Sequence, residues 1–136
     1  MAMKVLVLTL GFDERFAIRA MLRAGIESGD RIIIFIVKPV EEKALACLKI
    51  VREFLSKYVE DVDFRVSEIA INRFEDAVLK IKKQLQDITK GANKVILNLS
   101  GGMKLLTFET LIASLLLGLN CIVEIELENF TDVVSF

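Results

Sequence analysis

The chain contains 136 residues, of which 54% are apolar and 27% charged, and its formal net charge is −1. This length suits one domain that buries a hydrophobic core without disulfides or a structural metal. The near-neutral charge argues against the uniformly basic surface that duplex nucleic acid requires. Because histidine is absent, the sequence excludes histidine-based triads and most zinc sites. We predict neither a metal nor a cofactor.

The mean hydropathy of +0.52 is high for a soluble monomer of this size. A membrane span does not explain it, because the apolar stretch 105–119 contains polar residues and is shorter than the roughly 20 residues required. No signal peptide is predicted either, since the first apolar run ends at Leu10. Cys47 and Cys121 form no CxxC motif and are expected to be buried, which fits a reducing cytoplasm. We therefore attribute the surplus hydropathy to a partner chain.

Apolar runs and helical spacings alternate along the whole chain. In chain order they predict a strand at 4–10, a helix at about 13–26, a strand at 31–37, a helix at 41–58, a strand at 62–71, a helix at 74–88, a strand at 94–99, a helix at 101–119, a strand at 121–127 and a strand at 131–136. Such alternation predicts an α/β domain with a mostly parallel sheet and helices on both faces.

The composition of the strands indicates their order in the sheet. The strands at 4–10, 31–37 and 94–99 are almost continuous apolar runs, which is typical of strands covered on both faces. Those at 62–71 and 121–127 alternate apolar and polar residues, so we place them near the margins. The prediction is a Rossmann-like, doubly wound order 3-2-1-4-5-6 with the sixth strand antiparallel. Its crevice then opens at the carboxyl ends of the first and fourth strands.

The loop after the fourth strand reads Asn-Leu-Ser-Gly-Gly-Met-Lys over residues 98–104 and leads directly into a helix. Ser100 is predicted to cap this helix, and the two glycines allow a ligand to approach the backbone closely. Amide groups around Gly102 would then face an anion at the positive end of the helix dipole. The alternative is a tight turn with Lys104 in solvent. A lysine in the first turn opposes the dipole by roughly 0.3–1 kcal/mol, which favours the anion.

The loop after the first strand reads Thr-Leu-Gly-Phe-Asp-Glu-Arg over residues 9–15. Phe12 could stack on a base, and Arg15 could bind a phosphate. The alternatives are a hydrophobic staple for Phe12 and a solvated helix residue for Arg15, with Asp13 as the N-cap. Taken singly, these alternatives are favoured, but the two loops together favour an anionic, nucleotide-like ligand.

The sequence lacks the motifs of several better-known nucleotide-binding proteins. It contains no GxxxxGK[ST], and no GxGxxG follows the first strand. Apolar residues and a threonine stand where a phospho-receiver domain would carry carboxylates. Glu124, Glu126 and Glu128 are interpreted as a solvated face of the fifth strand rather than as metal ligands.

The predicted helix at 101–119 is apolar almost all round, which indicates burial on more than one side. We expect the sheet to cover one side and a second copy of the chain the other. A two-fold dimer of this kind would bring two 100–104 loops near one axis and would suit a ligand with two-fold symmetry. The alternative is a helix covered wholly within its own chain.

The loops at 9–13 and 98–104 resemble those of CARF domains (CRISPR-associated Rossmann fold), and the resemblance covers essentially the whole chain. The sequence is most similar to the N-terminal domain of archaeal Csa-type CRISPR transcriptional regulators, in which a winged helix-turn-helix follows. Residues 1–136 are therefore expected to form one sensing domain, either truncated from a longer regulator or a stand-alone sensor. DNA contact would require an output domain beyond these residues.

This resemblance implies a cytoplasmic homodimer that binds a cyclic oligoadenylate, with cyclic tetra-adenylate expected, and that controls an effector or transcriptional output. The ligand-binding residues that it implies are Thr9, Gly11, Phe12, Asp13, Arg15, Asn98, Ser100, Gly101, Gly102, Met103 and Lys104.

Two alternatives remain open within this resemblance. The first is a metal-independent ring nuclease, in which a ribose 2′-hydroxyl attacks the adjacent phosphate. Lys104 would then stabilise the transition state, and Ser100 or Thr9 would be its hydrogen-bonding partner. Because neither loop contains an obvious general base, we rank sensing above cleavage. The second alternative is a dimerisation module without a ligand.

Overall fold

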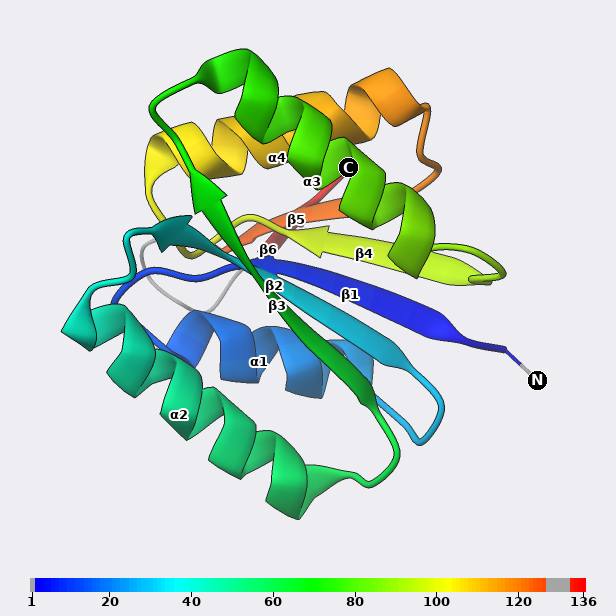
Figure 1. Ribbon diagram of the computed structural model, residues 1–136. Coiled ribbons are helices and arrows are strands. Elements are labelled where there is room, and N and C mark those ends of the chain that lie inside the picture. The colour runs from blue at the N-terminus through cyan, green and yellow to red at the C-terminus, as the bar shows by residue number, and fades with distance from the viewer. Residues whose placement is uncertain (1, 127–132) are drawn as a thin grey trace.

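The computed structural model describes residues 2–126 and 133–136 (Figure 1). Its strands are β1 (Lys4–Thr9), β2 (Arg31–Lys38), β3 (Asp63–Ala70), β4 (Lys94–Asn98), β5 (Ile122–Glu126) and β6 (Val133–Ser135). Its helices are α1 (Arg15–Ala24), α2 (Glu42–Tyr58), α3 (Phe74–Ile88) and α4 (Lys104–Leu117). The strands form one sheet in the order β3-β2-β1-β4-β5-β6, in which only the β5–β6 pair is antiparallel. The predicted fold and strand order are confirmed.

Two helices cover each face of this sheet, with α1 and α2 on one side and α3 and α4 on the other (Figure 1). Successive side chains of the central strand β1 supply both cores, as the two-residue period of a strand requires. Leu6 and Leu8 pack with α1 and α2, whereas Val5 and Val7 pack with α3 and α4. All four side chains are buried, which explains why the middle of this strand is a continuous apolar run.

Helix α4 begins three residues later than predicted. Gly102 has a φ of 84°, a left-handed conformation that keeps it outside the helix, and Met103 occupies the N-cap position. The prediction that Ser100 caps the helix is therefore wrong. Helix α1 also begins later than expected, at Arg15, whose backbone N–H donates to Asp13 Oδ1 at 3.0 Å. Asp13 thus satisfies an amide of the first turn, although Glu14 holds the N-cap position.

The exposed side of α4 answers one of the open alternatives. The helix packs on the sheet and against α3, yet Phe108, Leu115 and Leu116 are exposed by 52%, 66% and 62%. Its apolar surface is therefore not covered wholly by its own chain. None of the described helices has the length and apolar character needed to cross a membrane.

Two further expectations concern the cysteines and the turn between the last two predicted strands. Cys47 is buried as predicted, but Cys121 is only half-buried and lies just before β5 rather than in it. The turn expected at 128–130 lies outside the described residues.

Candidate functional site

The two glycine loops meet at one edge of the sheet. Strands β1 and β4 are parallel neighbours with Leu8 opposite Asn98, so the loops that follow them leave the sheet side by side. A Cβ added to Gly11 would lie 3.1 Å from the Cα of Gly102. The Thr9 hydroxyl donates a hydrogen bond to the carbonyl oxygen of Gly101. The predicted convergence of the loops is confirmed.

This contact depends on glycine. A Cβ on Gly101 would lie 2.7 Å from the backbone oxygen of Thr9, closer than real Cβ contacts allow. A Cβ on Gly102 would lie 3.1 Å from the Cβ of Thr9, and the positive φ of Gly102 disfavours any other residue. The second loop can therefore lie flat against the end of β1 only because both positions lack side chains.

The two loops form one wall of a cavity of about 420 Å³. Its lining comprises Leu10, Gly11, Phe12, Asp13, Phe16, Val37, Pro39, Glu41, Ala44, Ser100, Gly101, Gly102 and Met103. Seven of the eleven predicted residues are in this lining, namely Gly11, Phe12, Asp13, Ser100, Gly101, Gly102 and Met103. The sequence interpretation missed the opposite wall, which the end of β2 and the start of α2 supply. The predicted strand order already placed the second strand beside the first, so the loop after the second strand could have been expected to border the same cavity.

Four predicted residues lie outside the lining. Thr9 and Asn98 are buried and hold the loops in place: the Asn98 Oδ1 atom accepts from the N–H of Ser100 at 3.1 Å. Arg15 forms a two-point ion pair with Asp13, with distances of 2.9 and 2.8 Å, and this pairing lowers the pKa of the Asp13 carboxyl. Lys104 is exposed at the first position of α4, next to the lining residue Met103.

The N-terminus of α4 has no side-chain cap. Among the residues that the structure describes, no side chain accepts from its first-turn N–H groups, which stand beside Lys104 and the glycine loop. A second cation, missed by the sequence interpretation, comes from α2: Lys43 Nζ lies 5.9 Å from the ring centre of Phe12. An uncapped helix start with nearby cations is an arrangement that accommodates an anion.

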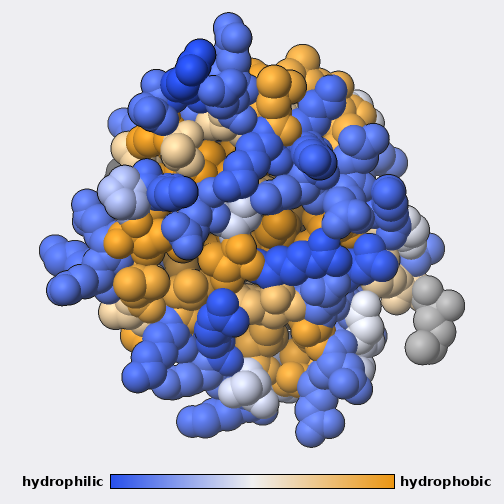
Figure 2. Space-filling view, in the orientation of Figure 1, coloured by the Kyte–Doolittle hydropathy of each residue, from blue (hydrophilic) through white to orange (hydrophobic). Residues whose placement is uncertain are grey.

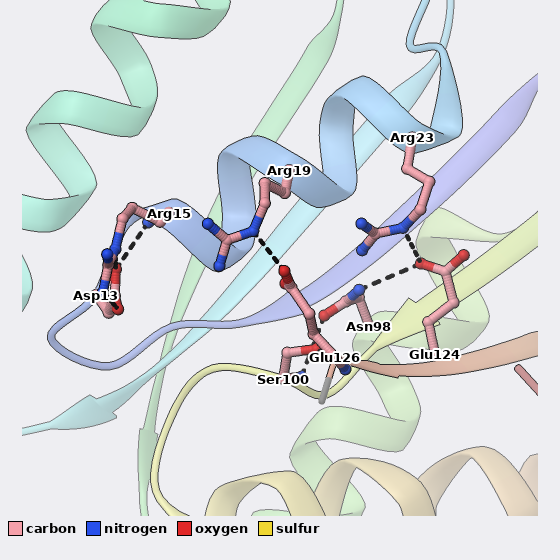
Figure 3. Close-up of polar contacts among 8 residues, drawn as sticks. All are labelled: Asp13, Arg15, Arg19, Arg23, Asn98, Ser100, Glu124 and Glu126. Carbon is pink, nitrogen blue, oxygen red and sulfur yellow. Dashed lines mark hydrogen bonds and ion pairs between the residues drawn. The ribbon is translucent and has the colours of Figure 1, made fainter. Parts of the chain in front are cut away.

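Behind the loop lies a polar network that joins α1 to β5 (Figure 3). Glu126 is buried, forms an ion pair with Arg19, and donates its backbone N–H to the Ser100 hydroxyl at 2.7 Å. Glu124 accepts from Asn98 Nδ2 at 3.2 Å and lies 3.8 Å from Arg23 Nε. The network therefore holds the side chains of Asn98 and Ser100 in the loop.

The solvated-face interpretation is thus wrong for Glu124 and Glu126, while Glu128 lies outside the described residues. The physical reason is that α1 covers this face of β5 and presents Arg19 and Arg23, one helical turn apart, to the two carboxylates. The sequence contained a signal for this pairing. The two arginines are four residues apart on a helix, and the two glutamates are two residues apart on a strand, so each pair lies on one face of its element.

The family model described as the Csa3 CRISPR-associated Rossmann-like domain matches residues 4–136. The chain belongs to this family. The resemblance inferred from the two loops is thereby confirmed for this Csa3-family domain. No curated protein matches the domain in sequence.

Two solved structures share the fold of the Csa3-family domain. One is Can2 from Sulfobacillus thermosulfidooxidans in complex with cyclic tetra-adenylate, with a TM-score of 0.69 and 10% identity over 98% of this chain and 34% of that chain. The other is Csm6 from Enterococcus italicus bound to cyclic hexa-2′-fluoro-hexa-dAMP, with a TM-score of 0.67 and 12% identity over 96% of this chain and 35% of that chain. The Csa3-family domain thus spans about a third of each of these proteins.

The part of the Csa3-family domain that the structure describes contains no group of three or more cysteine, aspartate or glutamate side chains able to hold a metal ion. The chemistry that the cavity offers lies in backbone amides, the Ser100 hydroxyl, two nearby lysines and an exposed aromatic ring, Phe12. These groups bind phosphates and stack on bases.

Proposed function

We propose that this domain is a cytoplasmic, homodimeric sensor that binds a cyclic oligoadenylate, with cyclic tetra-adenylate as the expected ring. Its occupied state would control an effector or a transcriptional output, and any DNA contact would come from a further domain. The observation that carries the proposal is the convergence of two glycine loops and an uncapped helix N-terminus on one cavity.

The lining supports a ligand with both phosphates and bases. The first turn of α4 and Lys104 would bind phosphate oxygens, and each charge-assisted hydrogen bond would contribute roughly 1.5–3 kcal/mol. Phe12 and Met103, both partly exposed, offer apolar surface for an adenine beside Val37 and Pro39. A few such contacts in each subunit support tight binding.

Proteins with the same fold supply the second argument. Can2 has been solved with cyclic tetra-adenylate, and Csm6 with a cyclic hexanucleotide analogue. A ring of this kind exceeds a drug-sized ligand, whereas the 420 Å³ cavity lies in the lower part of the range for such ligands. Two copies of the cavity, facing each other, suit the ring better than one.

The exposed apolar residues of α4 support a dimer. Phe108, Leu115 and Leu116 lie on the helix whose N-terminus borders the cavity, and Phe108 extends the surface by packing on Phe74 of α3 at 6.0 Å between ring centres. Burying such a surface against its copy would remove exposed apolar area and bring two cavities together.

Calorimetric titration tests the binding proposal. Lys104→Ala should weaken cyclic tetra-adenylate binding at least tenfold, which is about 1.4 kcal/mol, without lowering the melting temperature. Lys49→Ala, which removes an exposed lysine of α2, is the matched control and should bind like the wild type. Unchanged affinity in Lys104→Ala would remove that residue from the site. Wild-type protein that binds neither the tetra- nor the hexa-adenylate ring would refute the function.

Light scattering tests the dimer. We expect twice the chain mass of 15.3 kDa for the wild type, and dissociation in Leu116→Glu, which places a charge on the exposed face of α4. A wild-type monomer at micromolar concentration would contradict the symmetric arrangement.

Chromatography tests whether the ligand is cleaved. After incubation with the protein, the cyclic oligoadenylate should be recovered intact, whereas linear products would favour the ring nuclease.

A further inference from the structure

A second cavity lies at the lateral margin of the sheet, between the outermost strand β3 and helix α3. Its volume is about 780 Å³. In the order β3-β2-β1-β4, strand β2 lies between β3 and β1, whose loop belongs to the first site. Figure 2 views this side of the molecule, where hydrophilic side chains gather over α3 and beside the edge strand. The proposed oligoadenylate function uses none of these residues.

Basic side chains dominate the lining of this cavity. Arg65 comes from β3, Lys80 and Lys83 come from α3, and Lys90 follows that helix. Two carboxylates, Asp63 and Asp87, pair with Arg65 at distances of 2.8 and 2.9 Å, so this cluster by itself carries one net negative charge.

None of the three lysines pairs with a carboxylate among the described residues. Lys80 Nζ donates to the backbone oxygen of Glu68 at 2.6 Å, a contact with a neutral acceptor. Lys83 and Lys90 are exposed and have no ion pair among the described residues. The four basic side chains outnumber the two carboxylates, so the cavity keeps a net positive charge in a domain whose net charge is −1.

Two polar atoms in the same lining lack partners. Ser67 is only 6% exposed, and its Oγ has no hydrogen-bond partner among the described residues. The Oε1 atom of Gln84 is also buried, and it too has no hydrogen-bond partner among the described residues. Leaving a buried polar group unsatisfied costs about 1–3 kcal/mol, so such groups call for a specific partner. Ser67 and Gln84 together can donate to one ligand atom and accept from another.

The chemistry of the lining narrows the class of ligand. The lysines suit phosphate oxygens, whereas an unpaired acceptor and an unpaired hydroxyl in the same lining suit the hydroxyl groups of a ligand. The lining contains no aromatic side chain on which the bases of a nucleic-acid strand could stack. The volume falls within the range of small-molecule sites.

We propose that the groove between β3 and α3 binds a small phosphorylated molecule that carries free hydroxyl groups, a sugar phosphate or a nucleotide. The lysines bind its phosphate, and Ser67 and Gln84 bind a hydroxyl group. The site is independent of the oligoadenylate cavity, so either can fail without the other.

Calorimetric titrations of the full chain with ribose 5-phosphate, ADP and inorganic phosphate test this site. Ribose 5-phosphate or ADP should bind saturably, and inorganic phosphate at least tenfold more weakly because it lacks the sugar hydroxyls. Binding by both compounds, or by ribose 5-phosphate alone, indicates recognition of the sugar phosphate. Binding by ADP alone indicates a nucleotide.

Three variants locate the binding. Lys83→Ala and Ser67→Ala should each weaken it at least tenfold, while Lys82→Ala, which removes the neighbouring lysine outside the lining, should change it less than twofold. Ser67→Ala should melt no lower than the wild type, because it removes an unsatisfied buried hydroxyl.

Three results would overturn the proposal. The first is the absence of saturable binding by both ribose 5-phosphate and ADP. The second is affinity unchanged in both Lys83→Ala and Ser67→Ala. The third is affinity lost in Lys104→Ala but kept in Lys83→Ala, which would move the ligand to the first cavity.

Discussion

Glu109 provides the sharpest test of the energetics. It lies on the side of α4 that faces the sheet, in the same stripe as the buried residues Leu106 and Ala113, and it is 0% exposed. Neither of its carboxylate oxygens has a hydrogen-bond partner among the described residues. Burial raises the pKa of the Glu109 carboxyl because the charged form loses its hydration. The folded chain therefore holds this group in its neutral form more strongly than the unfolded chain does.

The sign of the pH dependence follows from this shift. Below the pKa of the unfolded state, near 4.3, the carboxyl is protonated in both states, and its burial then destabilises the fold least. As the pH rises from there to the folded pKa, the unfolded state releases the proton first, and stability falls by up to about 1.4 kcal/mol per pH unit. The total loss by neutral pH is therefore about 1.4 kcal/mol for each pH unit that separates the unfolded pKa from the folded one, counted up to pH 7.

Urea unfolding from pH 4 to pH 8 measures this loss. Glu109→Gln keeps the shape but cannot ionise, so it should equal the wild type near pH 4 and exceed it by a growing margin as the pH rises, at up to about 1.4 kcal/mol per pH unit. Glu53→Gln, at an exposed position on α2, is the control and should follow the wild type at every pH. Parallel curves for the wild type and Glu109→Gln would refute the reasoning.

Two further predictions concern the loop and the network behind it. Gly101→Ala should lower the free energy of unfolding by about 1–3 kcal/mol in urea, because its Cβ would lie 2.7 Å from the Thr9 oxygen, and an unchanged value would show that the loops can separate freely. Arg19→Met should cost about 3 kcal/mol at pH 7 because it leaves Glu126 buried without its cation. In a Glu126→Gln background the same change should cost much less, and equal losses in both backgrounds would disprove the coupling.

Much of the fold was predictable because its signals are local. The apolar β1 and the alternating β3 and β5 identify central and marginal strands, since each residue faces one side of the sheet or the other. Parallel pairing then requires the loops after β1 and β4 to leave the same edge, which brings Gly11 and Gly102 together. Those steps need only the alternation of apolar and polar residues along each strand and the geometry of a parallel sheet.

The roles of individual polar side chains were less predictable. Ser100 was expected to cap α4, but its hydroxyl binds the backbone of Glu126, and the helix starts three residues later than predicted. Thr9 and Asn98 were expected at the ligand, but their side chains hold the loops. A polar side chain pairs with whatever the fold brings near it, and the neighbouring residues in the chain do not specify that partner.

The sequence by itself determined the α/β class, the strand order and the meeting of two glycine loops, because hydrophobic periodicity and glycine backbone freedom act locally. Only the tertiary structure decided that α1 covers the glutamates of β5 and that the start of α2 completes the first cavity. It also decided that Ser67 Oγ and Gln84 Oε1, which have no hydrogen-bond partner in the described part of the chain, line one cavity with three lysines. Each of these depends on how a helix lies across a strand distant in sequence, and that placement results from the packing of the whole core.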